Sequence, residues 1–89
     1  MIRLADTRLL RTDAYVNGAW IAAQGGGTLE VHNPANGERL GSVPDCGGAE
    51  TRLAIEAAAV ALPAWRARTA AERAALLRRL HALILANQE

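Results

Sequence analysis

Two turn signatures in the first half of the chain most constrain what it can fold into. The first is Asn17-Gly18, which lies between the short apolar-rich segments 14–16 and 19–21. Both turn residues tolerate the positive φ angles of a type I′ turn, so the pair is a strong β-hairpin signal. The second is the segment 33–37, Asn-Pro-Ala-Asn-Gly, in which proline presets φ and Asn-Gly again offers left-handed positions. The first half is therefore predicted to consist of antiparallel hairpins.

The segments around these turns have the patterns of short strands and loops. Residues 28–32 alternate apolar and polar at period two, which places Leu29 and Val31 on one face of a strand. Residues 38–43 are a fourth strand candidate, and Pro44 is predicted to end it. Residues 4–11 are a candidate short helix.

The second half has the composition of helices. Residues 48–62 are strong helix formers with Leu53, Ala57 and Ala61 on one face. Gly47 is a candidate cap, with Glu50 three residues later to complete a capping box. Pro63 lacks an N–H and is predicted to stop this helix. Trp65 is then expected in the connection, packed back on the junction.

A second capping box opens the last helix. The Thr69 hydroxyl is expected to accept the Glu72 N–H, and the Glu72 carboxylate to return to the Thr69 N–H. An apolar stripe at helical spacing follows, made of Leu76, Leu77, Leu80, Leu83 and Ile84. Four polar residues are expected to lie mostly off this stripe: Arg73, Arg78, Arg79 and Asn87. No stop signal precedes Glu89, so the helix is predicted to run on without a cap.

These elements predict an α+β fragment. It has a short N-terminal helix, three to four antiparallel strands in hairpins, and then two antiparallel helices. A length of 89 residues allows at most one small domain, here a single partial domain with a strand region 1–46 and a two-helix region 47–89. Apolar residues are 51% of the chain, but many are alanine and none is phenylalanine, so we expect a modest core and a marginal fold.

Charge, cysteine content and hydropathy limit the partners and the cellular compartment that we expect for the chain. The net charge is +1, which suggests no strong electrostatic partner. Cys46 is the only cysteine, which rules out an intramolecular disulfide and fits a reducing, cytoplasmic setting. The first residues show no secretory signal pattern, and no apolar run approaches the roughly 20 residues that span a bilayer. No membrane partner is expected.

We expect no catalytic, cofactor-binding or metal-ligating residue in this chain. Cys46 follows Asp45, which would raise the thiol pKa, and no histidine is near in sequence. His32 and His81 are far apart and lack other ligands at metal spacing. Gly25-Gly26-Gly27 lies between two strands and lacks the following Gly-Lys-Ser/Thr of a phosphate loop. No G-x-G-x-x-G fingerprint with a downstream acid is present.

Two features suggest binding to a macromolecule. The arginine pairs Arg66/Arg68 and Arg78/Arg79 could suggest nucleic acid, but interspersed acids and scarce aromatics favour a solvated helix face, so no nucleic-acid partner is expected. The Leu76–Ile84 stripe is either core packing or a seam for a partner. That partner would be a second copy or the complementary remainder of a larger protein.

The order of these motifs resembles the N-terminus of the NAD(P)-dependent aldehyde dehydrogenases. Tyr-Val-Asn-Gly-x-Trp at 15–20, Asn-Pro-Ala-Asn-Gly-Glu at 33–38 and Pro-x-Trp at 63–65 occur in register. Within the family the chain is most similar to bacterial succinate-semialdehyde dehydrogenases. The segments that carry this closer similarity are 9–11, 43–45, 50–52, 54–58, 64–66, 72–74 and 77–79.

The resemblance implies the start of the family's cofactor-binding domain. The family's cysteine nucleophile, glutamate base, oxyanion asparagine and NAD or NADP loops come later in the longer protein, and Cys46 does not sit in the nucleophile motif. Some relatives bind a monovalent cation through main-chain oxygens at positions that map to Val31 and His32. Full-length relatives oxidise succinate semialdehyde to succinate with NAD(P)+. The chain is thus expected to be a truncated piece of such an enzyme, inactive alone; the alternative is a helical-hairpin interaction module.

Overall fold

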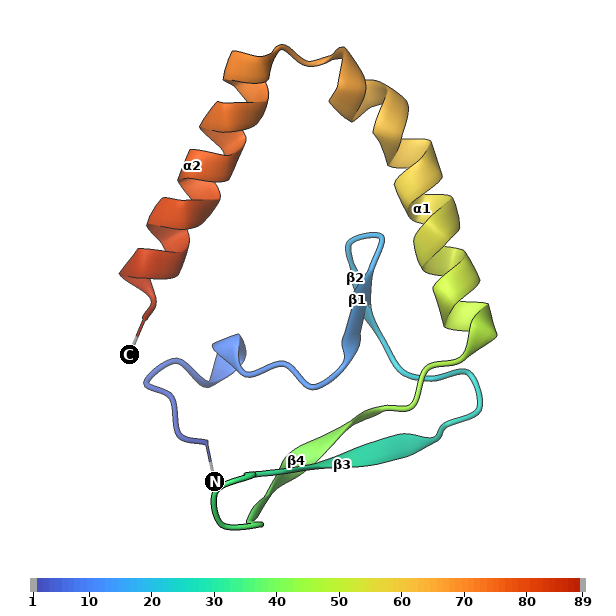
Figure 1. Cartoon of the computed structure of the whole chain (residues 1–89), viewed down its shortest axis with the longest axis vertical. Coiled ribbons are helices and arrows are strands. Elements are labelled where there is room, and N and C mark those ends of the chain that lie inside the picture. Colours follow the sequence, from blue (N-terminus) through green and yellow to red (C-terminus); the bar gives the residue numbers. More distant parts are fainter. Residues whose placement is uncertain (1, 89) are drawn as a thin grey trace. The chain divides into compact units, whose positions relative to one another are not determined.

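The computed structural model describes residues 2–88, and all its strands lie before its two long helices (Figure 1). A 3-10 turn, Thr7–Leu9, is followed by strands β1 (Ala14–Val16), β2 (Ala19–Ile21), β3 (Thr28–His32) and β4 (Arg39–Pro44), then by helices α1 (Gly48–Ala67) and α2 (Ala70–Ala86). The strands form two separate two-stranded antiparallel sheets, β1–β2 and β3–β4. The α+β class with antiparallel hairpins and two helices is confirmed.

The chain divides into two compact units between Ala57 and Ala58, so α1 begins in the first unit and ends in the second. The antiparallel packing of the helices, and the division into regions 1–46 and 47–89, stay predictions.

The β1–β2 hairpin has the predicted turn. Asn17 has φ 50° and Gly18 has φ 77°, the positive values that a type I′ turn needs. The register pairs Tyr15 with Trp20, and their ring centroids are 4.9 Å apart. The Arg11 guanidinium carbon lies 5.1 Å from the centre of the Trp20 ring. Ring contact and cation–π attraction therefore add to the backbone pairing of a very short hairpin.

We predict that Gly18→Ala destabilises this hairpin by about 1–2 kcal/mol. A Cβ at position 18 meets no atom within 4 Å, so the whole cost is the left-handed backbone that alanine disfavours. Gly41→Ala is a matched control, because Gly41 has no positive φ and equally open space. Amide hydrogen exchange of the hairpin residues in both variants measures the difference, and equal protection would contradict the type I′ assignment.

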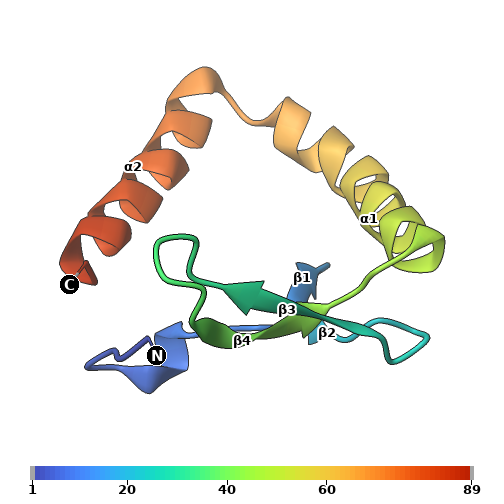
Figure 2. The same ribbon diagram turned by 60° about the horizontal axis from the view of Figure 1, so that its bottom comes forward.

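The β3–β4 ribbon is the longer sheet, and Figure 2 shows its two strands running side by side to the 33–38 turn. In that turn the Ala35 N–H donates to the Asn33 side chain over 2.9 Å, and the Gly37 N–H donates to the Asn33 carbonyl over 2.7 Å. Only Gly37 takes a positive φ, 75°. Val31 pairs with Gly41 and His32 with Arg39, so Leu40 is the extra residue of a bulge. The strand is shifted by one residue from the predicted 38–43, and Pro44 is its last residue.

The predicted helix over residues 4–11 is wrong in length. Only the 3-10 turn Thr7–Leu9 forms, with the Asp6 carboxylate accepting from the Arg8 N–H and from its guanidinium. A segment this short gains too few hydrogen bonds to offset helix nucleation.

Pro63 does not end helix α1, which continues to Ala67 and contains Trp65. The prediction of a connection at Pro63 was therefore wrong. Proline removes one N–H and crowds the carbonyl four residues back, but alanine and other good helix formers flank it on both sides. The helix ends instead near Arg68, whose N–H donates to the Trp65 carbonyl over 3.2 Å.

Helix α2 starts as predicted and ends differently. The Glu72 N–H donates to the Thr69 hydroxyl over 3.2 Å, and that hydroxyl donates to the Glu72 carboxylate over 3.1 Å, so the return contact joins the two side chains. The expectation of a helix without a cap was wrong. Asn87 caps it: its N–H donates to the Ile84 carbonyl and its side-chain amide to the Leu83 carbonyl.

Arg73 was also misplaced by the sequence analysis. It precedes Leu76, Leu77 and Leu80 by three, four and seven residues, which is the spacing of one helix face. It is half-buried, whereas Arg78 and Arg79 are exposed. An arginine therefore belongs to the apolar stripe itself.

Among residues 2–88 only Ala23 and Glu50 are buried. Large apolar side chains on both units are exposed, including Tyr15, Leu53, Val60, Leu77 and Ile84. The secondary structure is thus complete while its apolar faces remain uncovered, and the modest core expected from composition is absent from this part of the chain.

Candidate functional site

A tertiary contact of the first unit is centred on Glu50. Its side chain is only 7% exposed. One carboxylate oxygen accepts from the Gly47 N–H over 2.8 Å, which completes the predicted capping box at the start of α1. The other accepts from the backbone N–H of Gln24, in the loop that follows β2. A single carboxylate thus holds the start of α1 against the end of the first hairpin.

The same hydrogen bonds set the charge of Glu50. The backbone N–H of Gln24, then that of Gly47 and its own, lower the pKa of the Glu50 carboxyl below its usual value, and burial opposes them weakly. The carboxylate is therefore ionised at neutral pH and fully engaged by main-chain donors. Its role is that of an anchor, because a general acid or base needs a pKa near the working pH.

We predict that this anchor is lost in acid. Because the folded pKa is lower than the unfolded one, the stabilisation is fully present above the ordinary value of 4.5 and disappears as pH falls through the folded pKa. Glu50→Gln should therefore be less stable than the unaltered chain at pH 7, and the gap should close towards pH 3. Amide hydrogen exchange of Gln24 and Gly47, compared between the two chains at each pH, measures the gap, with exposed Glu56→Gln as control. A gap that persists at low pH would contradict the assignment.

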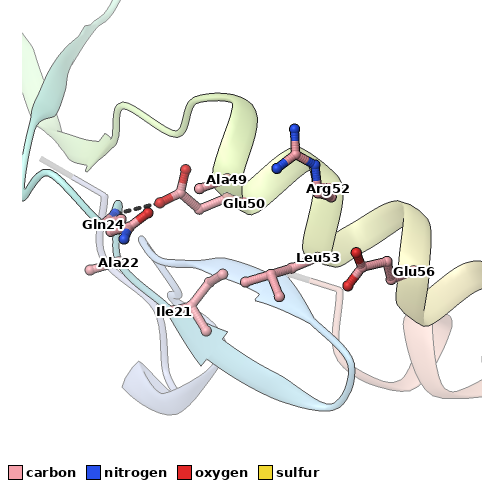
Figure 3. Close-up of a pocket in the computed structure, with 8 residues that line it drawn as sticks. All are labelled: Ile21, Ala22, Gln24, Ala49, Glu50, Arg52, Leu53 and Glu56. Atoms are coloured by element: carbon pink, nitrogen blue, oxygen red, sulfur yellow. Dashed lines mark hydrogen bonds between the residues drawn. The ribbon is translucent and has the colours of Figure 1, made fainter.

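An open depression lies beside this anchor, with a volume of about 500 Å³ (Figure 3). Figure 3 shows Ile21 on β2 and Leu53 on α1 facing each other across it, with Glu50 and Gln24 joined at one end. The lining residues are Ile21, Ala22, Gln24, Ala49, Glu50, Arg52, Leu53 and Glu56. The lining offers no nucleophile beside a base, so the depression fits the docking of an apolar side chain better than it fits catalysis.

The structure places the residues singled out in the sequence without joining them into a reactive site. Cys46 is an exposed free thiol. His32 lies 3.5 Å from Glu30, which also pairs with Arg39 at 3.1 Å on the exposed ribbon. Within residues 2–88, no three His, Cys, Asp or Glu side chains gather so as to hold a metal ion. No helix in this part of the chain combines the length and apolarity needed to cross a bilayer.

One contact and one residue placement were not predicted from the sequence. The Gln24–Glu50 hydrogen bond joins residues 26 positions apart, and no local pattern points to it. The placement of Arg73 on the apolar face was available from helical spacing alone, since it precedes Leu77 by four residues.

Comparison with known proteins decides the family. The sequence profile described as the aldehyde dehydrogenase family matches residues 20–89, most of the chain. The chain belongs to the aldehyde dehydrogenase family. Its fold and turns are those of this family's N-terminal part, as the resemblance implied.

Two of the relatives to which this chain is similar are named as semialdehyde dehydrogenases. The glutarate-semialdehyde dehydrogenase of Pseudomonas aeruginosa is 58% identical over 88 residues, 99% of this chain and 18% of the relative. The NADP(+) succinate-semialdehyde dehydrogenase of Escherichia coli is 51% identical over 88 residues, again 99% and 18%. This chain thus spans less than a fifth of the length of these relatives.

Solved structures agree with the curated relatives. An NADP-dependent enzyme of Escherichia coli superposes with a TM-score of 0.90 at 52% identity, over 96% of this chain and 18% of that one. The succinate-semialdehyde dehydrogenase of Burkholderia pseudomallei gives 0.88 at 54% identity, over 94% and 17%. This chain therefore has the fold of the N-terminal segment of an aldehyde dehydrogenase.

Proposed function

We propose that this chain is the N-terminal scaffold segment of a cytoplasmic semialdehyde dehydrogenase. The substrate is succinate semialdehyde or its homologue glutarate semialdehyde, and the product is the acid. The observation that carries the proposal is identity of 51–58% over 88 residues to enzymes with these substrates. The unpaired Cys46 fits a reducing compartment.

The residues present do not fit NAD or NADP. Gly47 comes directly before helix α1, which begins at Gly48, and a phosphate would bind at such a helix N-terminus. The Glu50 carboxylate already occupies the Gly47 N–H there, and its negative charge would repel a pyrophosphate. Cofactor binding and the chemistry on the aldehyde are therefore assigned to sequence outside residues 1–89.

The part played by this segment is to supply folded surfaces on which the catalytic part of the enzyme packs. The exposed apolar residues of both units and the depression beside Glu50 support this role, because isolated soluble domains rarely leave so many large apolar side chains uncovered.

A graft tests the proposal. Residues 1–89 replace the matching segment of the Pseudomonas aeruginosa enzyme, and the grafted enzyme is assayed with glutarate and succinate semialdehydes. We expect kcat/KM within about tenfold of the parent, since no reacting group changes. A second graft with residues 70–86 scrambled is the control and should lose activity. A soluble, folded graft of the natural segment without activity would overturn the proposal.

A second candidate is an interaction module that binds a partner or a second copy through the Leu76–Ile84 stripe. The observation in its favour is the exposure of Leu77 and Ile84, at 58% and 60%. Light scattering of the isolated chain distinguishes the two proposed functions. A defined dimer that unfolds cooperatively supports the interaction module. A poorly folded chain that gains order only in the graft supports the scaffold segment.

A further inference from the structure

The two units carry opposite charge, which the net value of the whole chain hides. Residues 2–57 hold five arginines and seven acidic side chains, a net charge of −2. Residues 58–89 hold five arginines and two acids, Glu72 and Glu89, a net charge of +3 with His81 neutral. Glu72 is engaged by the Thr69 hydroxyl at the start of α2. The helix that bears the apolar stripe therefore lacks a free carboxylate of its own within residues 58–88.

Arg73 is one of the five arginines of the positively charged second unit and lies on helix α2. Its Nε is buried and has no hydrogen-bond acceptor among the described residues. It shares a face with Leu76, Leu77, Leu80 and Ile84, which lie three, four, seven and eleven positions further on. A guanidinium stays charged at all ordinary pH values, and a buried donor without an acceptor is costly. Whatever covers this face also covers a cation that needs an anionic partner.

We propose that the α2 face formed by Arg73, Leu76, Leu77, Leu80 and Ile84 docks on an apolar surface that presents a carboxylate to Arg73. The occupant is the rest of the same dehydrogenase polypeptide, and the proposal rests on the proposed function. Two observations select it: the buried Nε of Arg73 has no acceptor among the described residues, and this chain covers only 18% of the glutarate-semialdehyde dehydrogenase to which it is similar.

The chemistry favours a carboxylate over a neutral carbonyl. The planar guanidinium presents its donors as a fork that matches both oxygens of a carboxylate. A buried arginine facing only apolar groups would leave an uncompensated charge, which is strongly destabilising. Arg73 thus acts as a positioning residue that sets the register of α2 on the rest of the enzyme, while the leucines supply contact area.

The test uses the full-length graft, in which Arg73→Met keeps the apolar stem and removes the charge. Arg73→Lys keeps a charge without the fork, and the exposed Arg78→Met and Arg79→Met are matched controls. We expect Tm to fall by roughly 3–6 °C for Met, by less for Lys, and not measurably for the controls. A Met variant as stable as the controls, or Lys no better than Met, overturns the inference.

A crystal structure of the unaltered graft provides a second measurement if Arg73→Met does not fold. We expect a carboxylate oxygen from beyond residue 89 within hydrogen-bond distance of the Arg73 guanidinium. A guanidinium that faces solvent, neutral groups or another subunit alone overturns the inference. An inactive graft counts against the proposed function, whereas an active graft indifferent to Arg73 counts against this inference only.

Discussion

The isolated 89-residue chain should not oxidise succinate or glutarate semialdehyde with NAD+ or NADP+ above a protein-free blank. The lone thiol, Cys46, is exposed, and residues 2–88 give it no histidine or carboxylate contact that would activate it. The helix N-terminus nearest to it is already occupied by Glu50. Without an activated nucleophile or a held cofactor, the expected loss relative to the graft is the whole catalytic rate.

The absorbance of the reduced cofactor measures the rate of oxidation, and the graft with the same substrate is the positive control. If a residual rate is seen, the Cys46→Ala variant shows whether it depends on the Cys46 thiol. A rate that scales with chain concentration and disappears in Cys46→Ala would make Cys46 a nucleophile and contradict the scaffold role. A rate unchanged in that variant would come from a contaminant.

The second large effect concerns stability. The isolated chain should unfold in a broad, weakly cooperative transition and associate as its concentration rises. Only Ala23 and Glu50 are buried among residues 2–88, whereas Leu77, Leu80 and Leu83 are each more than half exposed. Burial of apolar surface is the dominant favourable term in folding, and here little of it offsets the entropy of ordering the chain. Calorimetry and light scattering measure the transition and the mass.

Leu80→Glu should have opposite effects in the isolated chain and in the graft: it should improve the behaviour of the former and destabilise the latter. In the isolated chain it should reduce association, because Leu80 is 54% exposed and the new charge would lie on the apolar face through which two copies associate. In the graft it should destabilise by roughly 3 kcal/mol or more, because the same position would then be covered. Arg79→Glu, on an exposed position of the same helix, is the control. A sharp monomeric transition of the isolated chain would contradict the prediction and indicate a self-sufficient fold.

Features set by residues close in sequence were predictable. The Asn17-Gly18 turn and the Thr69 side-chain cap on the Glu72 N–H depend on residues one to three positions apart, and both formed. Errors arose where local signals compete. Pro63 opposes helix, yet its alanine-rich neighbours keep α1 continuous. The alternation in β3 predicted only that Leu29 and Val31 share a face, and it did not reveal that all five residues of the strand are exposed.

By itself, the sequence determined the strands, the turns, the helix starts and the family, since each depends on backbone preferences and hydrogen bonds within a few residues. Only the tertiary structure decided that one Glu50 carboxylate ties the N–H of Gly47 to that of Gln24, and that the Nε of Arg73 is buried without an acceptor. Such contacts depend on bringing distant chain segments together, which is governed by loop closure and burial and leaves no local pattern to read.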